Sequence, residues 1–395
     1  MKPLSRLRMG SAVAAAALMI GLSGPASAQD PKLDELIKLI EKQQQQINAL
    51  RARLETTEGK AEQAATDAEA ATSKPSFLDT VTVGGVAEVE ATNSEDFTGT
   101  DTSDITLATV EFFVDTQPHE YLSTHVQFLY EDDGNENITL DEAFATLGNT
   151  EKFPLYMQAG KWAVPFGAFD TDLSSDPLTQ SLAEVKEAAI LGGVAYEGFT
   201  LEGYIYNGDT QKGGESDKID QFGLAAGYGG ETNGVAYNLG AGYINNMADS
   251  DALTDTLGGN ATAIDGYVSG FDVHGDVAFS NVTLRGGYLT ALKSFETGEV
   301  AFDGQGAQPA AWHAEAAYSM PILGHDTTFA ATVQGTREAR ALGLPEMRYG
   351  AAVTVGIVEH FSITGEFLHD EDYSVADGGT GNSGHTATIK LAAEY

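Results

Sequence analysis

The connections between the expected strands of this chain alternate between long and short from residue 79 to Tyr395. Long loops on one side and tight turns on the other, with an even number of strands, are typical of an outer-membrane β-barrel. We therefore expect an all-β, antiparallel, sixteen-stranded barrel over residues 79–395. The strands are predicted at 80–92, 104–115, 122–131, 138–148, 155–163, 188–196, 199–206, 220–228, 234–245, 266–278, 282–290, 310–319, 326–335, 348–357, 361–369 and 385–395.

The last of these strands has the clearest alternation of apolar and polar residues. Apolar residues occupy every second position up to the C-terminus, at Ala387, Ile389, Leu391, Ala393 and Tyr395. Successive side chains of a strand point to opposite faces, so one face is apolar and the other polar. A terminal aromatic residue with this pattern is similar to the signal by which outer-membrane assembly machinery recognises barrels.

The region before the barrel has a different period. Three positive charges, an apolar run and Ala26-Ser27-Ala28 predict a secretory signal peptide over 1–28. A heptad pattern from Leu33 to Ala71 then predicts an α-helical coiled coil within 29–74. Because an even-stranded barrel has both ends on the side of its short turns, we expect the coiled coil in the periplasm. A lone, partly helical linker is the alternative.

Composition narrows the function classes. The chain has no cysteine, which excludes disulfides and thiolate metal sites. Its formal net charge is −37, which argues against a nucleic-acid partner and favours cationic solutes. The alternative is that the acidic residues of the loops serve only to keep the protein surface soluble.

The longest predicted loop, 164–187, carries the candidate constriction. In many sixteen-stranded porins the third outer loop narrows the barrel, and carboxylates in a narrow pore attract cations. Lys161 and Lys186 are expected to face these acids across the lumen. An external loop with solvated charge is the alternative. The candidate acids are Asp170, Asp172, Asp176, Glu184 and Glu187.

The wall of the barrel supplies further candidates. Alternation predicts that Glu88, Glu90, Glu111 and Glu131 face the lumen. Facing is open for the strands at 104–115 and 138–148, since a one-residue slip exchanges the two faces. Tyrosines near strand ends suit a ring at the membrane interface. They are Tyr204, Tyr206, Tyr228, Tyr243 and Tyr288.

Enzymatic and metal sites are not expected. None of the eight histidines has metal-ligand spacing such as H-E-x-x-H, and none lies in a G-x-S-x-G context. Carboxylates near Asp170 and Asp104 have oxygen ligands but complete no calcium-loop spacing. We therefore expect no catalytic residue, no metal and no cofactor.

Several runs together resemble the LbtU-type siderophore porin family across the whole barrel. These runs are Ser103 to Glu111, Asp141-Glu142-Ala143-Phe144, Glu151 to Tyr156, Ala159-Gly160-Lys161, Pro165-Phe166-Gly167, Ser175 to Thr179 and Gly208-Asp209. The resemblance implies an outer-membrane channel for iron-siderophore complexes, and it carries no siderophore-contacting residue to a position here.

The expected activity is passive. Energised siderophore receptors need about 22 strands with a plug in the lumen, whereas sixteen strands can leave an aqueous channel. The expected partners are small solutes, among them a ferric siderophore, and outer-membrane lipid, and a homo-oligomer is favoured as a trimer because large porins commonly are trimers. The alternatives are a general cation-preferring porin and, in another class, a structural anchor tethered through the coiled coil.

Overall fold

The computed structural model describes residues 42, 60, 80–132, 137–216, 218–258 and 262–395. The predicted signal peptide and coiled coil lie outside these residues, apart from two isolated positions. The chain divides into two compact units, Met1–Pro75 and Ser76–Tyr395. The barrel belongs to the second unit.

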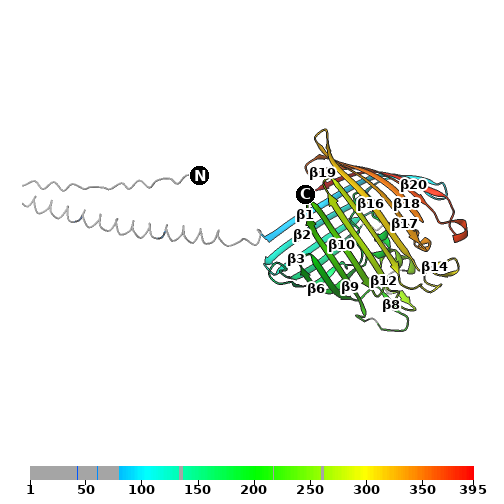
Figure 1. Ribbon diagram of the computed structural model, residues 1–395, viewed down its shortest axis with the longest axis horizontal. Helices are drawn as coiled ribbons and strands as arrows, with labels where there is room; N and C mark the ends of the chain where they lie inside the picture. Colours follow the sequence, from blue (N-terminus) through cyan, green and yellow to red (C-terminus); the bar gives the residue numbers. More distant parts are fainter. Residues whose placement is uncertain (1–41, 43–59, 61–79, 133–136, 217, 259–261) are drawn as a thin grey trace, which may run out of the picture. The chain divides into compact units, whose positions relative to one another are not determined.

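Sixteen antiparallel strands form one closed barrel, as predicted from the alternation of the sequence (Figure 1). Each strand pairs with the next one along the barrel, and β1 closes the ring by pairing with β20. The backbones of Gly85 and Tyr395 exchange two hydrogen bonds of 3.0 and 3.1 Å at this seam. The strands are β1 (Val81–Glu95), β2 (Asp101–His119), β3 (Leu122–Glu131), β4 (Ile138–Gly148), β5 (Leu155–Ala163), β6 (Lys186–Tyr196), β7 (Phe199–Tyr206), β9 (Gln221–Thr232), β10 (Val235–Ile244), β12 (Gly270–Phe279), β13 (Val282–Ala291), β16 (Ala310–Ile322), β17 (His325–Arg337), β18 (Met347–Val358), β19 (Phe361–Glu371) and β20 (Ser383–Glu394).

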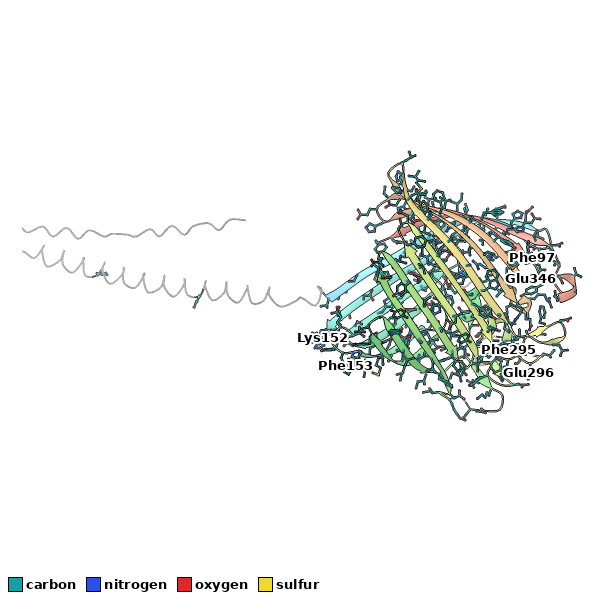
Figure 2. All side chains as sticks on the ribbon, in the orientation of Figure 1. Phe97, Lys152, Phe153, Phe295, Glu296 and Glu346 are labelled. Atoms are coloured by element: carbon teal, nitrogen blue, oxygen red, sulfur yellow. The ribbon has the colours of Figure 1, made fainter. Side chains whose placement is uncertain are left out.

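Short turns close one end of the barrel. The pairs Asn233-Gly234 and Leu323-Gly324 both have positive φ at both residues, 52° and 77° in the first and 54° and 89° in the second. This is the type I′ geometry whose twist matches that of the flanking strands. Figure 2 shows Lys152 and Phe153 at this end, and Phe97, Phe295, Glu296 and Glu346 at the end with the long connections.

The two faces of the wall differ as the alternation predicts. On β20, Ile389 is 57% exposed, whereas its neighbour Thr388 is 6% exposed. Many large apolar side chains are exposed in the same way on the outer face, such as Leu201 and Leu239. Contiguous apolar surface of this extent needs an apolar environment. The barrel therefore has the outer face of a lipid-embedded wall.

The predicted tyrosine ring is only partly present. Tyr228 and Tyr288 are exposed on the outer face, but Tyr204 and Tyr206 are buried. Their parity in β7 turns them inward, where they pack in an apolar cluster with the long loops. The prediction for these two residues is wrong because position near a strand end does not determine the face.

The long connections contain structure of their own. They hold the helices α2 (Leu178–Ala183) and α3 (Asp251–Leu257), the short turns η2 (Arg340–Leu342) and η3 (Val375–Asp377), and the small strands β8 (Thr210–Lys212), β11 (Thr262–Ile264), β14 (Ala301–Phe302) and β15 (Gln305–Gly306). Within the described ranges, no helix is long and apolar enough to cross a membrane.

An arginine on the outer face should be costly. Ile190 lies near the middle of β6, pairs with Ile205 of β7 and is 53% exposed. We expect Ile190→Arg to lower the free energy of unfolding in lipid by about 2–4 kcal/mol if the residue lies near the bilayer midplane. Reversible urea unfolding in vesicles measures this. Ile219→Arg, in the connection between β7 and β9, is the matched control and should cost far less, since that side chain is exposed outside the strands.

Candidate functional site: the loop across the lumen

The connection between β5 and β6, residues 164–185, crosses the interior of the barrel. It leaves β5, the fifth strand around the ring, and meets β17, the thirteenth. There the backbone N–H of Leu178 donates to Oε1 of Gln334 at 2.7 Å. Thr179 Oγ1 also lies 2.9 Å from Nδ1 of His313 on β16. Both contacts join the loop to the wall opposite its origin, so the loop spans the lumen.

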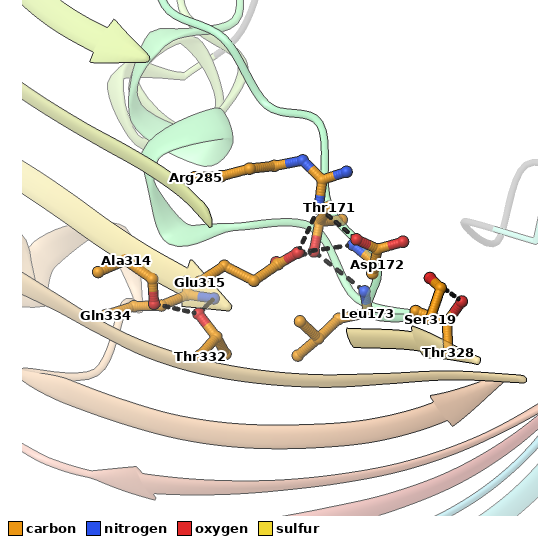
Figure 3. Close-up of polar contacts among 10 residues, drawn as sticks. All are labelled: Thr171, Asp172, Leu173, Arg285, Ala314, Glu315, Ser319, Thr328, Thr332 and Gln334. Carbon is orange, nitrogen blue, oxygen red and sulfur yellow. Dashed lines mark hydrogen bonds and ion pairs between the residues drawn. The ribbon is translucent and has the colours of Figure 1, made fainter. Parts of the chain in front are cut away.

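The first set of contacts that hold the loop centres on Glu315 of β16, which is 6% exposed (Figure 3). Its carboxylate accepts hydrogen bonds from Thr171 Oγ1 at 2.6 Å and from the backbone N–H of Asp172 at 2.9 Å. Arg285 of β13 donates to Glu315 at 2.8 Å and also binds the Asp172 carboxylate. A cation thus joins a loop acid to a wall acid, which offsets the cost of burying the Glu315 charge.

The second set centres on Glu366 of β19, which is 5% exposed. Its carboxylate accepts from the backbone N–H groups of Ser174 and Ser175, at 2.6 and 3.2 Å, and from the Ser175 hydroxyl. The Ser174 hydroxyl donates to Glu90 of β1 at 2.9 Å. Hydrogen bonds to a carboxylate are about twice as strong as neutral ones. The two wall carboxylates therefore hold residues 171–175 across the lumen.

Apolar packing holds the two ends of the loop on the other side of the lumen. Phe166 and Leu182 are 1% and 0% exposed. They belong to a buried cluster with Met247 and Leu253 from the connection 245–269 and Phe295 from the connection 292–309. Three long connections thus fold together, whereas only the first of them was predicted to fold into the barrel.

The loop acids differ in their surroundings. Asp170 is exposed, and Asp172 is bound to Arg285. The Asp176 side chain is exposed to solvent, yet protein atoms surround it closely. Partial desolvation is the main cause that raises the pKa of its carboxyl above the ordinary value, and repulsion from Glu184 is the second cause. The Asp176 carboxyl therefore takes up a proton at a higher pH than an ordinary aspartate does.

The wall candidates lie on the inner side of β1, β2 and β3. Glu88 binds Lys390 of β20 at 3.1 Å. Glu111 lies near Glu88, Glu131 and Asp141, so four carboxylates share one part of the inner wall. The register supports this placement, because Glu88 is paired with Thr109 and Thr109 with Glu131, and directly opposed residues share a face.

The two candidate lysines differ in the residues that they contact. Lys186 is the first residue of β6 and donates to Asp141 at 2.7 Å. A bulge in β4 lets both Asp141 and Glu142 face inward, since Glu142 and Leu140 pair with successive residues of β3 and Asp141 is the extra residue between them. Lys161, by contrast, pairs with Ala143 and Ala188 on the outer face. The expectation that Lys161 faces the loop acids is wrong, because the register of β5 turns its neighbour Trp162 inward instead.

Glu187 is the second residue of β6 and pairs with Trp162 on the inner side. It lies near Asp209 and Asp249 of the long connections rather than near residues 171–176. Glu187 therefore lies apart from the acids at residues 170–176.

Sequence reasoning missed the wall residues that hold the loop: Glu315, Glu366, Arg285, Gln334 and His313. A signal was present for three of them. His313 and Glu315 are the polar residues at every second position of a strand otherwise rich in alanine, and Arg285 stands between Leu284 and two glycines. No pattern in the sequence around these residues indicates that they contact a loop more than a hundred residues earlier.

The connections 207–220 and 245–269 meet at a buried carboxylate whose contacts should depend on pH. Asp249 accepts from the backbone and hydroxyl of Thr210, both at 2.7 Å. Burial raises the pKa of Asp249 to about 6, from an ordinary value of 3.8. A carboxyl with a raised folded-state pKa stabilises the fold more as the pH falls through that value.

We therefore expect the Thr210 amide to be roughly tenfold better protected from hydrogen exchange at pH 5 than at pH 7.5, after correction for intrinsic rates. Asp249→Asn is the control, because it removes the titrating group and should remove this dependence. An equal pH dependence in the variant would assign the effect to another group.

Solved structures of other proteins have a similar fold. An anion-selective porin from Comamonas acidovorans superposes with a TM-score of 0.55 at 12% identity, covering 80% of this chain and 99% of that one. The outer membrane channel DcaP of Acinetobacter baumannii gives 0.54 at 12% identity, over 80% and 97%. The fold is that of a porin.

Sequence comparisons give relatives at higher identity. A UPF0422 protein of Coxiella burnetii is 29% identical over 302 residues, covering 74% of this chain and 65% of its own length. A UPF0422 protein of Legionella pneumophila is 28% identical over 354 residues, covering 80% and 66%. The chain thus spans just under two thirds of these relatives. No model of a known protein family matches it.

Proposed function

We propose that this protein is an outer-membrane porin, which passes small solutes passively through an acidic lumen narrowed by the loop 164–185. The single observation that supports this most is the attachment of residues 171–175 to the far wall by Glu315 and Glu366. A loop bound at both sides of a barrel restricts its cross-section, and the acids on that loop then lie where solutes pass.

The charge of the lumen favours cations. Among the described residues, four inner cations are each bound to a carboxylate: Lys186, Arg285, Arg348 and Lys390. Other carboxylates on the loop and wall form no salt bridge with any described residue, namely Glu90, Glu111, Asp176, Glu184 and Glu366. The surplus is negative, and a low-dielectric wall strengthens its field. Asp170, Asp172, Asp176, Glu184 and Lys186 are the proposed constriction residues, with Glu187 beside them.

Planar-bilayer recording tests the channel. The mature protein, inserted from detergent, should give stable conductance steps, and its reversal potential under a potassium chloride gradient should indicate cation preference. Silence from folded protein would contradict the proposal, and anion preference would contradict its electrostatic part.

For the cargo, we propose iron-siderophore complexes, on the strength of the resemblance to LbtU-type porins. A strain that lacks this protein should grow poorly on a ferric siderophore as its only iron source and recover with the gene restored. Normal growth would leave a general cation-preferring porin, which the lumen charge by itself supports.

The segment 29–74 is proposed as a periplasmic coiled coil that supports a trimer. Deletion of 31–72 separates this role from the structural alternative. A porin keeps its conductance and loses oligomer stability in native electrophoresis, whereas a tether loses the attachment of the outer membrane to the cell wall.

A further inference from the structure

A basin of about 350 Å³ lies on the inner wall beneath the loop. Its floor comes from β7, β9, β10 and β12, and Pro165 and Gly167 of the loop border it. The polar side chains around it are Thr200, Glu202, Asn238 and His274. The volume is within the range of small-molecule sites. Glu202 and Asn238 lie nearer the short turns than the loop does, so a solute entering from the other end meets the loop first.

Glycines in adjacent strands create the basin. A Cβ at Gly229 would lie 2.5 Å from Oδ1 of Asn238, and one at Gly240 would lie 2.0 Å from Nε2 of His274. Without these Cβ atoms, the polar side chains lie flat against the wall instead of projecting into the lumen. Space remains above them, and their polar atoms form the floor.

The free polar atoms on this floor are mainly acceptors. Asn238 uses its Nδ2 to donate to Asp276 at 3.1 and 3.2 Å, which leaves its Oδ1 as an acceptor. His274 Nδ1 binds Asp272 at 2.7 Å, so the proton lies on Nδ1 and Nε2 accepts. No hydrogen bond from any described residue reaches this Nε2. Glu202 accepts from Tyr156 with one oxygen, Oε1, and offers the other.

A second observation is an unsatisfied buried acceptor on β12, the strand that carries His274. Asp272, which orients His274, has a side chain only 2% exposed, and its Oδ2 has no hydrogen-bond partner in the structure. A buried carboxylate oxygen without a donor is costly. The wall here is thus both negatively charged and rich in unpaired acceptors.

We propose that the basin binds a small hydroxylated ammonium compound, such as an amino sugar or amino alcohol. The ammonium group pairs with Glu202, and hydroxyl or further N–H donors bind Asn238 Oδ1 and His274 Nε2. An anionic solute of the same size is repelled, and a neutral one lacks the charge-assisted bond. This deepens the proposed porin function by naming a solute class that pauses after passing the loop.

The test uses three sugars of matched size: glucosamine, glucose and glucuronate. Calorimetry on the folded protein in detergent should detect glucosamine, with glucose weaker and glucuronate absent. Glu202→Gln keeps the acceptor for Tyr156 and should weaken glucosamine binding roughly tenfold. Glu111→Gln removes the same lumen charge from the other wall and should leave the affinity within about twofold of wild type. Ala225→Phe, which fills the basin from β9, should abolish binding without removing any charge.

In bilayers, glucosamine should interrupt the current of the wild type and not that of Ala225→Phe. Equal affinity in wild type and Glu202→Gln, or binding of glucuronate as tight as that of glucosamine, overturns the basin proposal. A protein that conducts nothing yet binds glucosamine through Glu202 would refute the porin function and uphold the basin, so the two failures are distinguishable.

Discussion

Replacing Glu366 with alanine should raise the single-channel conductance and weaken the filtering of larger solutes. The change removes the acceptor for the backbone N–H groups of Ser174 and Ser175 and for the Ser175 hydroxyl. Hydrogen bonds to a charged group contribute about 1.5–3 kcal/mol each and do not add fully. A net loss of about 3 kcal/mol shifts the attached loop toward release by on the order of a hundredfold.

Two variants separate release of the loop from loss of charge. Glu366→Gln removes the same charge but keeps an acceptor, so its conductance should lie between wild type and Glu366→Ala. Glu359→Gln changes a residue on a short turn whose side chain is 91% exposed, and should behave as wild type. Equal conductance in Glu366→Ala and Glu366→Gln would mean that the hydrogen bonds do not position the loop.

The barrel was predictable because its physical signal is local. Each strand carries its own alternation, and some of the tight turns carry a glycine, as at Asn233-Gly234 and Leu323-Gly324. All sixteen strands were found from these features alone, although β2, β6 and β20 begin earlier than expected and β12 begins later. Closure then follows, because a barrel leaves no strand edge unpaired.

The loop contacts were not predictable in the same way. Glu366 and Ser174 are far apart in the sequence, and neither has a pattern that names its partner. The prediction of which face Lys161 lies on was also wrong, because the strand that contains it has small or polar residues on both faces. The face of such a residue depends on the register with β4 and β6, which only the assembled barrel determines.

Neutralising the three loop aspartates, as Asp170→Asn, Asp172→Asn and Asp176→Asn together, should reduce the preference for cations. One charge at about 8 Å in water contributes about 0.5 kcal/mol, so three should change the permeability ratio of potassium to chloride by roughly tenfold. The loss of cation preference should be larger than if only unpaired acids were removed. Asp172 is paired with Arg285, so its neutralisation also leaves part of the Arg285 charge unbalanced. The reversal potential under a salt gradient measures it.

The matched control removes three charges from the short turns, as Glu151→Gln, Glu197→Gln and Glu359→Gln, and should leave the reversal potential nearly unchanged.

Acidification gives a second, independent check. The raised pKa of Asp176 means that the wild type loses this charge before an ordinary aspartate would, so its cation preference should start to fall at a correspondingly higher pH. The triple variant lacks this group and should show a smaller decline. If the triple variant and the wild type have equal reversal potentials at neutral pH, the aspartates lie away from the path of the ions, and selectivity must arise from the wall around Glu111.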